Sequence, residues 1–285
     1  MDEGRSPTPY AGRRIMLLTQ HGKERVLAPI AERSLGARLE VVTGFDTDSL
    51  GTFTRDVDRS GTQLDAARAK ARIAIERSGV PVGLGSEGSF GAGPFGFGGW
   101  NLEIVVLLDA ERDIEIVGSA QGPGVHLHGI VRSLEELREM AGRAGFPDHG
   151  LVLRPGGHDD PRIRKGIRSI AELEAAFEDA ARSSPDRSVS VENDLRAHQH
   201  PTRMSMIERA GLDLAARVAS PCPGCGTPGF GLFRCRTGLP CAACGTPTGE
   251  VSAEVHACVK CAFREDRPIA GRLRADPGSC PACNP

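Results

Sequence analysis

The cysteines constrain this chain more than any other feature of its sequence. All nine lie after residue 221, and eight of them fall into Cys-x-x-Cys pairs. Two residues between cysteines is the spacing at which one tight turn points both sulfurs at a single tetrahedral ion. Eight thiolates fill two four-coordinate sites with no ligand position left open, which is typical of structural zinc. The sequence therefore predicts two structural Zn²⁺ sites, with these ligands: Cys222, Cys225, Cys241, Cys244, Cys258, Cys261, Cys280 and Cys283.

The spacing leaves open how the four pairs combine. Gaps of 15 and 18 residues favour joining the first pair to the second and the third pair to the fourth. A nested arrangement, in which the 13-residue gap closes an inner ribbon, fits the spacing almost as well. An interleaved cross-brace is the third arrangement. The ninth cysteine, Cys235, is interpreted as an ordinary small residue and not as a ligand or a nucleophile.

The composition changes at Pro221. Residues 220–285 are rich in Gly, Pro and Cys and show no helical periodicity, so we interpret them as a small, separate, zinc-ribbon-like module. A segment this short and this poor in apolar residues needs its metal to fold. Its basic residues are offset by acidic ones, and it has few aromatic side chains for stacking on bases. A docking or stabilising role is therefore favoured over nucleic-acid binding, which stays open as a further partner.

Residues 14–219 alternate apolar runs with helical patterns. The predicted strands lie at 14–19, 39–43, 102–108, 113–117, 151–153 and 189–191. The predicted helices lie at 25–34, 62–79, 133–145, 169–181 and 205–218. Such alternation predicts an α/β fold, a layered domain with a mixed sheet, followed by the zinc-ribbon-like module. With 39% hydrophobic residues but 4% aromatic ones, the core is expected to be aliphatic and rich in alanine.

Charge and hydropathy limit the partners and the cellular location that we expect for the protein. The formal charge of −2 gives no global field that would attract nucleic acid or an anionic membrane. No apolar run reaches the length needed to cross a bilayer, so no membrane partner is expected. Residues 1–13 lack the apolar core of a signal peptide and are expected to form a disordered tail. We therefore expect a cytoplasmic protein, and a homo-oligomer is left open.

One carboxylate stands in a run of glycines between Val80 and Gly91, in the stretch VPVGLGSEGSFG. We interpret this stretch as a short strand that ends in a glycine-dense loop, where the backbone can approach a ligand closely. At the mouth of such a loop, the carboxylate of Glu87 can hold a divalent cation or act as a base. The alternative is an ordinary turn in which Glu87 is merely solvated.

Two further segments collect polar groups next to helices. The stretch TQHGKE at residues 19–24 leaves a strand and enters a helix, where backbone N–H groups and the helix dipole attract phosphate, and Lys23 would add a charge. In ENDLRAHQHPTR at residues 192–203, His198 and His200 could share a metal, or Arg203 could help to clamp a phosphate. A polar connection that caps the next helix explains the second segment equally well.

From Gly61 to Gly91 the sequence reads GTQLDAARAKARIAIERSGVPVGLGSEGSFG. This stretch resembles the helix, strand and acidic loop of the inosine/xanthosine triphosphate pyrophosphatase superfamily, and the resemblance spans residues 15–120. It implies phosphate contacts for Lys23 and Lys70 and a magnesium ligand at Glu87, with Glu24 as a weaker metal candidate. The sequence departs from the superfamily in the first turn, where His-Gly replaces the usual Asn, and in having one acid in the loop where many relatives have two.

The chain as a whole resembles a bacterial protein family of unknown function. The resemblance rests on the motifs TQHGKE, DTDSLGTF, SEGSFG, FPDHGLVLRP and RAHQHPTRM, together with the cysteine motifs CPGCGTPGFG, GLPCAACGTPT and CPACNP. It covers nearly everything after residue 13, and it implies no activity.

These observations lead to two functional hypotheses. The first is a magnesium-dependent hydrolase of a small, nucleotide-like phosphate ligand, in which Lys23, Lys70 and Arg203 contact phosphate and Glu87 holds the cation. The second is a non-enzymatic nucleotide-binding or scaffold protein, whose zinc module docks a protein or nucleic-acid partner.

Overall fold

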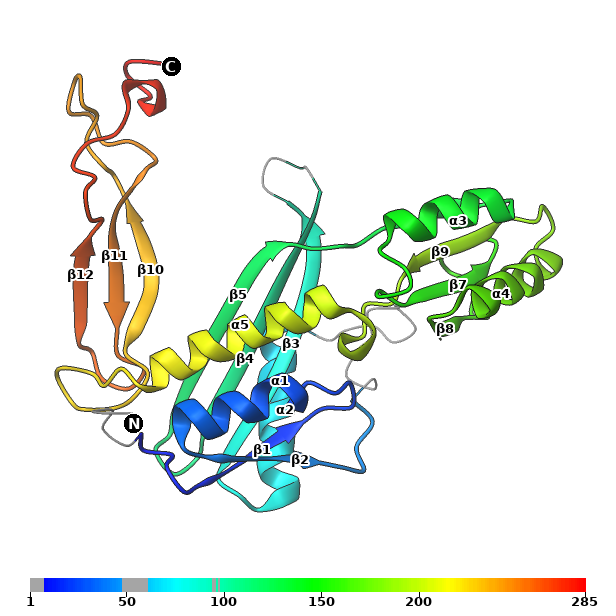
Figure 1. The fold of residues 1–285 in the computed structure, drawn as a ribbon. Coiled ribbons are helices and arrows are strands. Elements are labelled where there is room, and N and C mark those ends of the chain that lie inside the picture. Colours follow the sequence, from blue (N-terminus) through cyan, green and yellow to red (C-terminus); the bar gives the residue numbers. More distant parts are fainter. Residues whose placement is uncertain (1–7, 48–60, 94–95, 97) are drawn as a thin grey trace. The chain divides into compact units, whose positions relative to one another are not determined.

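The computed structural model describes residues 8–47, 61–93, 96 and 98–285 (Figure 1). Contacts divide the chain into two compact units. The first contains Met1–Glu111 and Val117–Ala215, and the second contains Arg112–Ile116 and Ala216–Pro285. The motif DTDSLGTF extends beyond the described residues, as does the polar segment around it.

The folded part of the chain begins at a lower residue number than the N-terminal sequence suggests. Residues 1–7 lie outside the described part, but residues 8–13, which were expected to belong to a disordered tail, are folded. Tyr10 is fully buried, and its hydroxyl donates to Oδ2 of Asp109 at 3.1 Å. Gly12 N–H donates to the carbonyl of Gly36 at 2.8 Å. An aromatic ring that finds both an apolar site and a partner for its hydroxyl is enough to anchor this segment.

The first unit contains a five-stranded mixed sheet of order β2-β1-β3-β4-β5. Its strands are β1 (Arg14–Leu18), β2 (Arg38–Val42), β3 (Val82–Ala92), β4 (Gly99–Asp109) and β5 (Ile114–Pro123). Strand β1 runs parallel to both β2 and β3, whereas β3 and β4 are antiparallel along their whole length. The parallel pairs require the helical crossovers that the sequence pattern predicts between these strands.

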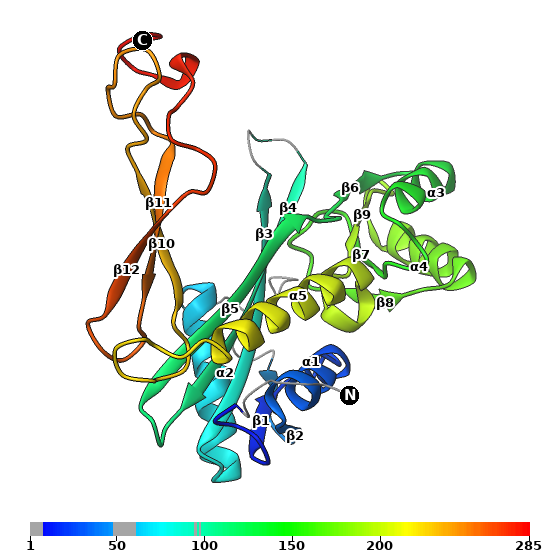
Figure 2. The ribbon, with the colours of Figure 1, turned by 60° about the vertical axis from the view of Figure 1, so that its left-hand side comes forward.

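Helices cover both faces of this sheet. They are α1 (Glu24–Ile30), continued by a π-helical turn (Ala31–Leu35), α2 (Gln63–Ser78) and α5 (Pro201–Val218). Figures 1 and 2 show α2 on one face, with α1 and α5 on the other. Helix α2 begins at the predicted capping box, because the Thr62 side chain accepts from Asp65 N–H while the Asp65 carboxylate accepts from Thr62 N–H. It ends at Gly79 in the left-handed conformation.

Strand β3 is continuous, so the predicted glycine loop around Glu87 is wrong. The glycines of this strand allow α2 to approach the sheet. A Cβ at Gly83 would lie 2.2 Å from the carbonyl oxygen of Ala71, and one at Gly85 would lie 2.0 Å from the carbonyl oxygen of Ala67. Glycine here makes room for a neighbouring backbone within the protein and not for a ligand at a turn.

A second sheet in the first unit has the antiparallel order β6-β9-β7-β8. Its strands are β6 (His128–Val131), β7 (Leu151–Pro155), β8 (Arg164–Ile167) and β9 (Val189–Asn193). Helices α3 (Leu134–Arg143) and α4 (Ile170–Ser183) begin at the predicted caps Ser133 and Ser169 and share an aliphatic core with the sheet. The sequence pattern missed β6 (HGIV) and β8 (RKGI), which at four residues each are too short to show a clear alternation.

The second unit is built on a three-stranded antiparallel sheet of β10 (Gly231–Thr237), β11 (Val251–Ala257) and β12 (Arg264–Pro268). Short 3-10 turns occur at Ala197–Gln199 in the first unit and at Pro277–Ser279 in the second. The predicted fold class is confirmed: layered α/β sheets precede a cysteine-rich module. Within the described residues, no helix is both long enough and apolar enough to cross a membrane.

Candidate functional site

A cluster of buried polar groups surrounds residues 86–88 of β3. The register between β1 and β3 covers only Met16↔Gly83 and Leu17↔Leu84, so the next part of β3 faces the turn that follows β1. That turn carries Lys23, which is only 5% exposed. Its Nζ donates to the carbonyl oxygen of Ser86 at 2.7 Å and contacts Ser86 Oγ at 3.2 Å. The buried Lys23 side chain therefore binds β3 at Ser86, just beyond the part of β3 that pairs with β1.

The second member of the cluster is an ion pair between Lys70 of α2 and Glu87 of β3. The Lys70 Nζ donates to Glu87 Oε1, and both side chains are buried. Gln63, at the start of α2, donates to the backbone carbonyl of Glu87 at 2.8 Å. Side chains alternate along a strand, so Glu87 shares the α2 face of the sheet with Gly85. The carboxylate predicted to lie at the mouth of a loop is thus held between a helix and a sheet.

The third member is an ion pair between Arg203 of α5 and Glu103 of β4. Arg203 Nε lies 2.6 Å from Glu103 Oε1, and Asn101 Nδ2 donates to the same oxygen at 3.1 Å. Glu103 pairs with Gly88 in the sheet register, and directly paired residues share a face. Gly88 and Glu87 are neighbours, so Glu103 lies on the face opposite Glu87.

All four predicted catalytic residues, Lys23, Lys70, Glu87 and Arg203, thus gather around one short part of β3, but on two faces of the sheet. Together with Glu103, they bring three cationic groups against two carboxylates. The pKa of Lys23 is lowered from its usual 10.5 to about 7, mainly because burial disfavours the charged amine. Arg203 and Lys70 lower it further, whereas Glu87 and Glu103 act in the opposite direction.

Glu103 was not among the site residues predicted from the sequence. Its signal was present, since Glu103 is the one charged residue in the apolar run LEIVVLL at residues 102–108. A carboxylate that is 0% exposed in such a strand needs a cationic partner, and Arg203 supplies it. Glu24, the weaker metal candidate, is the first residue of α1 and is half-buried. Within the described residues its carboxylate has no hydrogen bond or ion pair that ties it to the cluster.

The donor groups of the cluster limit how a magnesium ion could bind. In the described part of the chain, three or more His, Cys, Asp or Glu ligands converge on one point only at the cysteine groups. Glu87 and Glu103 lie on opposite faces of β3 and cannot share an ion without rearrangement. However, Mg²⁺ is commonly held by one or two carboxylates together with substrate phosphates. Glu87 meets that requirement for an ion that arrives with a phosphate ligand.

The two histidines of residues 192–203 have separate partners. His200 accepts from Arg203 N–H through Nδ1 at 3.1 Å, and its Nε2 lies 2.8 Å from the carbonyl oxygen of Val125, which can only accept. The ring is therefore neutral with its proton on Nε2, and burial lowers its pKa to about 4. His198 instead stacks on His21 at 5.3 Å between ring centroids. The structure does not bring these histidines together as metal ligands.

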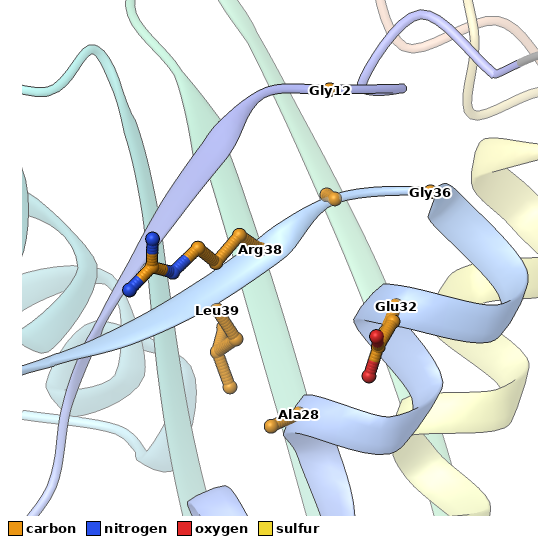
Figure 3. Close-up of a pocket in the computed structure, with 7 residues that line it drawn as sticks. Gly12, Ala28, Glu32, Gly36, Arg38 and Leu39 are labelled. Atoms are coloured by element: carbon orange, nitrogen blue, oxygen red, sulfur yellow. The ribbon is translucent and has the colours of Figure 1, made fainter.

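A pocket of about 490 Å³ lies away from this cluster, beside α1 and β2 (Figure 3). None of the residues predicted to act at a site lines it. Its lining is small and mostly apolar, with one acid and one base: Gly12, Ala28, Glu32, Gly36, Ala37, Arg38 and Leu39.

The eight paired cysteines form two four-thiol groups in the second unit. Within each group, the sulfurs lie within 4.8 Å of one another, which is close enough to hold one metal ion per group. One group is Cys222, Cys225, Cys258 and Cys261, and the other is Cys241, Cys244, Cys280 and Cys283. Cys235 lies in β10, is exposed and belongs to neither group.

The arrangement is the interleaved cross-brace, so the favoured pairing of neighbouring Cys-x-x-Cys motifs is wrong. The reason is the path of the chain, which Figure 1 shows. Strand β10 carries the chain from the first motif to the second, antiparallel β11 returns it to the third, and β12 runs out again towards the fourth. Successive motifs thus lie at opposite ends of the sheet, and alternate motifs meet at the same end.

The first two motifs are equivalent in sequence and in geometry. Each reads C-x-x-C-G-T-P, at residues 222–228 and 241–247. The first cysteine N–H donates to the threonine carbonyl at 2.8 Å in one motif and 2.9 Å in the other. In both, the second cysteine thiol lies 3.2 Å from the threonine Oγ1. One C-x-x-C-G-T-P turn therefore belongs to each metal group. The lengths of the gaps between the motifs do not indicate this.

The fold and these sites define a two-part protein, a layered α/β unit followed by a module with two four-cysteine groups that could hold metal ions. The chain matches the family described as a domain of unknown function (DUF6671) over residues 70–285, and it belongs to that family. The expected membership of a family of unknown function is thereby confirmed. Searches of curated proteins and of solved structures found no match.

Proposed function

We propose that the α/β unit is a hydrolase of a nucleotide-like phosphate substrate, which it binds at the cluster around residues 86–88. The observation that carries this proposal is the gathering of three buried cations, Lys23, Lys70 and Arg203, against two carboxylates. A buried charge is costly unless an opposite charge accompanies it. A phosphate group would supply the negative charge that the cluster needs when Lys23 is protonated.

Each residue has a distinct task in this proposal. Arg203 is always charged, and its planar guanidinium suits two phosphate oxygens at once. Lys23, with its pKa near 7, is partly neutral before the ligand binds. An approaching anion favours the charged amine, so Lys23 takes up a proton and stabilises negative charge on the phosphate. Lys70 and Glu87 lie on the α2 face and Arg203 on the other, so the ligand must bind where both faces can be reached, at the side of β3 beyond its pairing with β1. There Lys70 turns from the Glu87 carboxylate towards the ligand and thereby frees Glu87.

Glu87 would then hold a Mg²⁺ ion together with oxygens of the substrate. Such an ion neutralises phosphate charge and lowers the pKa of bound water. The task of the protein is to place the Glu87 carboxylate, which Gln63 supports by holding the backbone of β3. The resemblance of residues 15–120 to the inosine/xanthosine triphosphate pyrophosphatase superfamily assigns the same roles to Lys23, Lys70 and Glu87.

The cysteine module completes the proposal. Both groups consist of four thiols with no open ligand position, which favours Zn²⁺ in a structural role. The module would fold around its two ions and dock a partner. Thiolate ligands persist in a reducing compartment, so we place the protein in the cytoplasm.

The test is a screen for phosphate and pyrophosphate release from nucleoside mono-, di- and triphosphates, with full-length, zinc-loaded protein. The screen is run with Mg²⁺, with Mn²⁺ and with chelator alone. For an active substrate, Lys23→Gln and Glu87→Gln should each lower kcat/KM by about 100-fold or more. Arg138→Gln, at an exposed position of α3, is the matched control and should leave kcat/KM unchanged. Absence of turnover under every condition would reject the hydrolase.

One observation favours the second function, a nucleotide-binding or scaffold protein without catalysis. Both carboxylates of the cluster already have cationic partners, Lys70 for Glu87 and Arg203 for Glu103, as in ion pairs that serve the fold. Thermal shift with non-hydrolysable nucleotides separates the two functions. Stabilisation that Lys23→Gln abolishes, in a protein without turnover, would support binding alone. No stabilisation and no turnover would reject both nucleotide hydrolysis and nucleotide binding, and leave the scaffold role alone.

A further inference from the structure

Strand β2 is one of the two edge strands of the first sheet, and among the described residues its outer side has no strand beside it. Arg38 N–H donates to the carbonyl of Arg13 at 2.9 Å, across to the side of β1. Backbone groups alternate in direction along a strand, so those of Arg38 and Glu40 face β1, while those of Leu39 and Val41 point outward. No other described strand pairs with this side of β2.

In the described part of the chain, this edge is protected against pairing only by the charges of Arg38 and Glu40. In natural sheets, proline, bulges or covering loops commonly block an exposed edge. The register of β2 against β1 is regular, and the strand RLEVV contains no proline. Val41 is 36% exposed, and Leu39 borders the pocket beside Ala28 of α1 (Figure 3). An open hydrogen-bonding edge with apolar side chains beside it is a surface for another strand.

We propose that the occupant is a second copy of this chain, whose β2 pairs antiparallel with the first β2 about a two-fold axis at Leu39. Leu39 then exchanges both backbone hydrogen bonds with Leu39 of the partner subunit. Ala37, which would face the partner's Val41, is 2% exposed and donates its N–H to the carbonyl of Ala31, so the pairing is confined to Leu39 and its neighbours Arg38 and Glu40. The sheets of two protomers join into one continuous sheet.

The charges of β2 select this register. An axis at Arg38 would oppose two arginines, and an axis at Glu40 would oppose two glutamates. An axis at Leu39 places Arg38 opposite the partner's Glu40, and it does so twice. These residues occupy the non-hydrogen-bonded positions, where cross-strand side chains come closest. Within one chain, Glu40 already pairs with Arg14 at 2.6 Å and with Arg38 at 3.3 Å. The Arg38 side chain is 81% exposed, so it can turn from its own Glu40 to the partner's Glu40 while Arg14 stays in place.

The proposed two-fold axis also brings together the pockets beside α1 of the two copies. Leu39 and Val41 lie on the face of the sheet that α1 covers, because Arg38 and Glu40 alternate with them and face the other side. In the dimer, Leu39 meets its own copy on that face, and the two pockets open into one space between the copies of α1. The small side chain of Ala28 leaves room there for the leucine pair. The pocket is thus the apolar half of an interface whose polar half is the pair Arg38–Glu40.

The first test is the molar mass of the full-length, metal-loaded protein in solution, measured by light scattering and sedimentation over a range of concentrations. The wild type should be a dimer. Leu39→Pro removes the outward N–H of the central pair but no hydrogen bond to β1, and proline is tolerated at sheet edges. It should give a folded monomer. Leu39→Ile keeps that N–H and serves as the matched control, which should remain a dimer. A monomeric wild type at every concentration would overturn the proposal.

The second test concerns the register. Arg38→Glu opposes four glutamates across the axis and should weaken dimerisation by about tenfold. Adding Glu40→Arg restores both unlike pairs, so the double variant should dimerise more tightly than Arg38→Glu. The exposed pair Arg138–Glu174, reversed in the same way, is the control and should change nothing. Circular dichroism melts establish that each variant is folded. A folded double variant no tighter than Arg38→Glu would refute this register.

Discussion

Arg203 and Glu103, one hundred residues apart in the sequence, form an ion pair inside the α/β unit. Arg203 Nε lies 2.6 Å from Glu103 Oε1, and the two side chains are 2% and 0% exposed. The pair ties the first turn of α5 to the middle of β4. It also sets the electrostatic surroundings of Lys23, since Arg203 is the nearby charge that most lowers the pKa of that lysine.

Replacing one partner of this ion pair should destabilise the protein more than replacing both partners. Glu103→Gln leaves the buried guanidinium of Arg203 without its counter-charge and should lower the free energy of unfolding by about 3–5 kcal/mol. The double variant Glu103→Leu/Arg203→Met buries no charge and should lose clearly less. Denaturant unfolding of the wild type, of Glu103→Gln and of the double variant measures the difference. Equal losses in the single and double variants would contradict a charge-based explanation.

Replacing a glycine of β3 by alanine should destabilise the protein only where α2 packs closely against that glycine. A Cβ at Gly85 would sit 2.0 Å from the carbonyl oxygen of Ala67, so Gly85→Ala must push the helix away from the sheet. We expect a loss of about 2–3 kcal/mol in the free energy of unfolding. At Gly91 of the same strand nothing lies within 4 Å, and Gly91→Ala should change stability by less than about 0.5 kcal/mol. Similar losses at both positions would mean that the close packing is not the cause.

Lys23 should make stability rise with pH above neutrality. Its pKa is about 7 in the folded protein and 10.5 when unperturbed, so between these values the unfolded chain binds one more proton than the folded one. The free energy of unfolding therefore gains up to about 1.4 kcal/mol per pH unit from this residue in that window, and gains nothing from it below pH 7. Lys23→Met removes this contribution.

The measurement for Lys23 is the difference in unfolding free energy between the wild type and Lys23→Met at several pH values. Other groups titrate above pH 7 in both proteins, and subtraction removes them. The difference should grow in favour of the wild type as pH rises from 7 to 9. Parallel curves for the two proteins would show that the Lys23 amine titrates as it does in water.

Metal content should report the interleaved pairing of the cysteines. Cys222→Ser/Cys258→Ser alters one group and should leave one bound ion per chain, whereas Cys222→Ser/Cys241→Ser alters both groups and should leave none. Pairing of neighbouring motifs would give the reverse result. Elemental analysis of purified variants distinguishes the two, with Cys235→Ser as the control that keeps both ions. Chelation of both ions should unfold the module while the α/β unit stays folded.

Local patterns in the sequence were sufficient for most of the helices. Thr62, Ser133 and Ser169 mark three helix starts, because a capping interaction involves residues only three positions apart. The apolar runs likewise indicate the strands that are buried. Strands β6 and β8 escaped prediction because they are only four residues long, and pairing with β9 and β7 makes them strands. Glycine in β3 was misread as a turn signal, since the backbone of α2 that requires it is distant in sequence.

The sequence by itself determined the chemistry of both candidate sites. It predicted the eight cysteines as metal ligands, because two sulfurs converge within a single Cys-x-x-Cys turn, and it singled out Lys23, Lys70, Glu87 and Arg203 as candidate site residues. The tertiary structure alone decided which groups meet. The direction of β10 and β11 joins alternate cysteine motifs, and the alternation of side chains along β3 sends Glu87 to one face and brings Glu103 and Arg203 together on the other. Such partnerships depend on how distant strands align, and no spacing along the chain encodes that alignment.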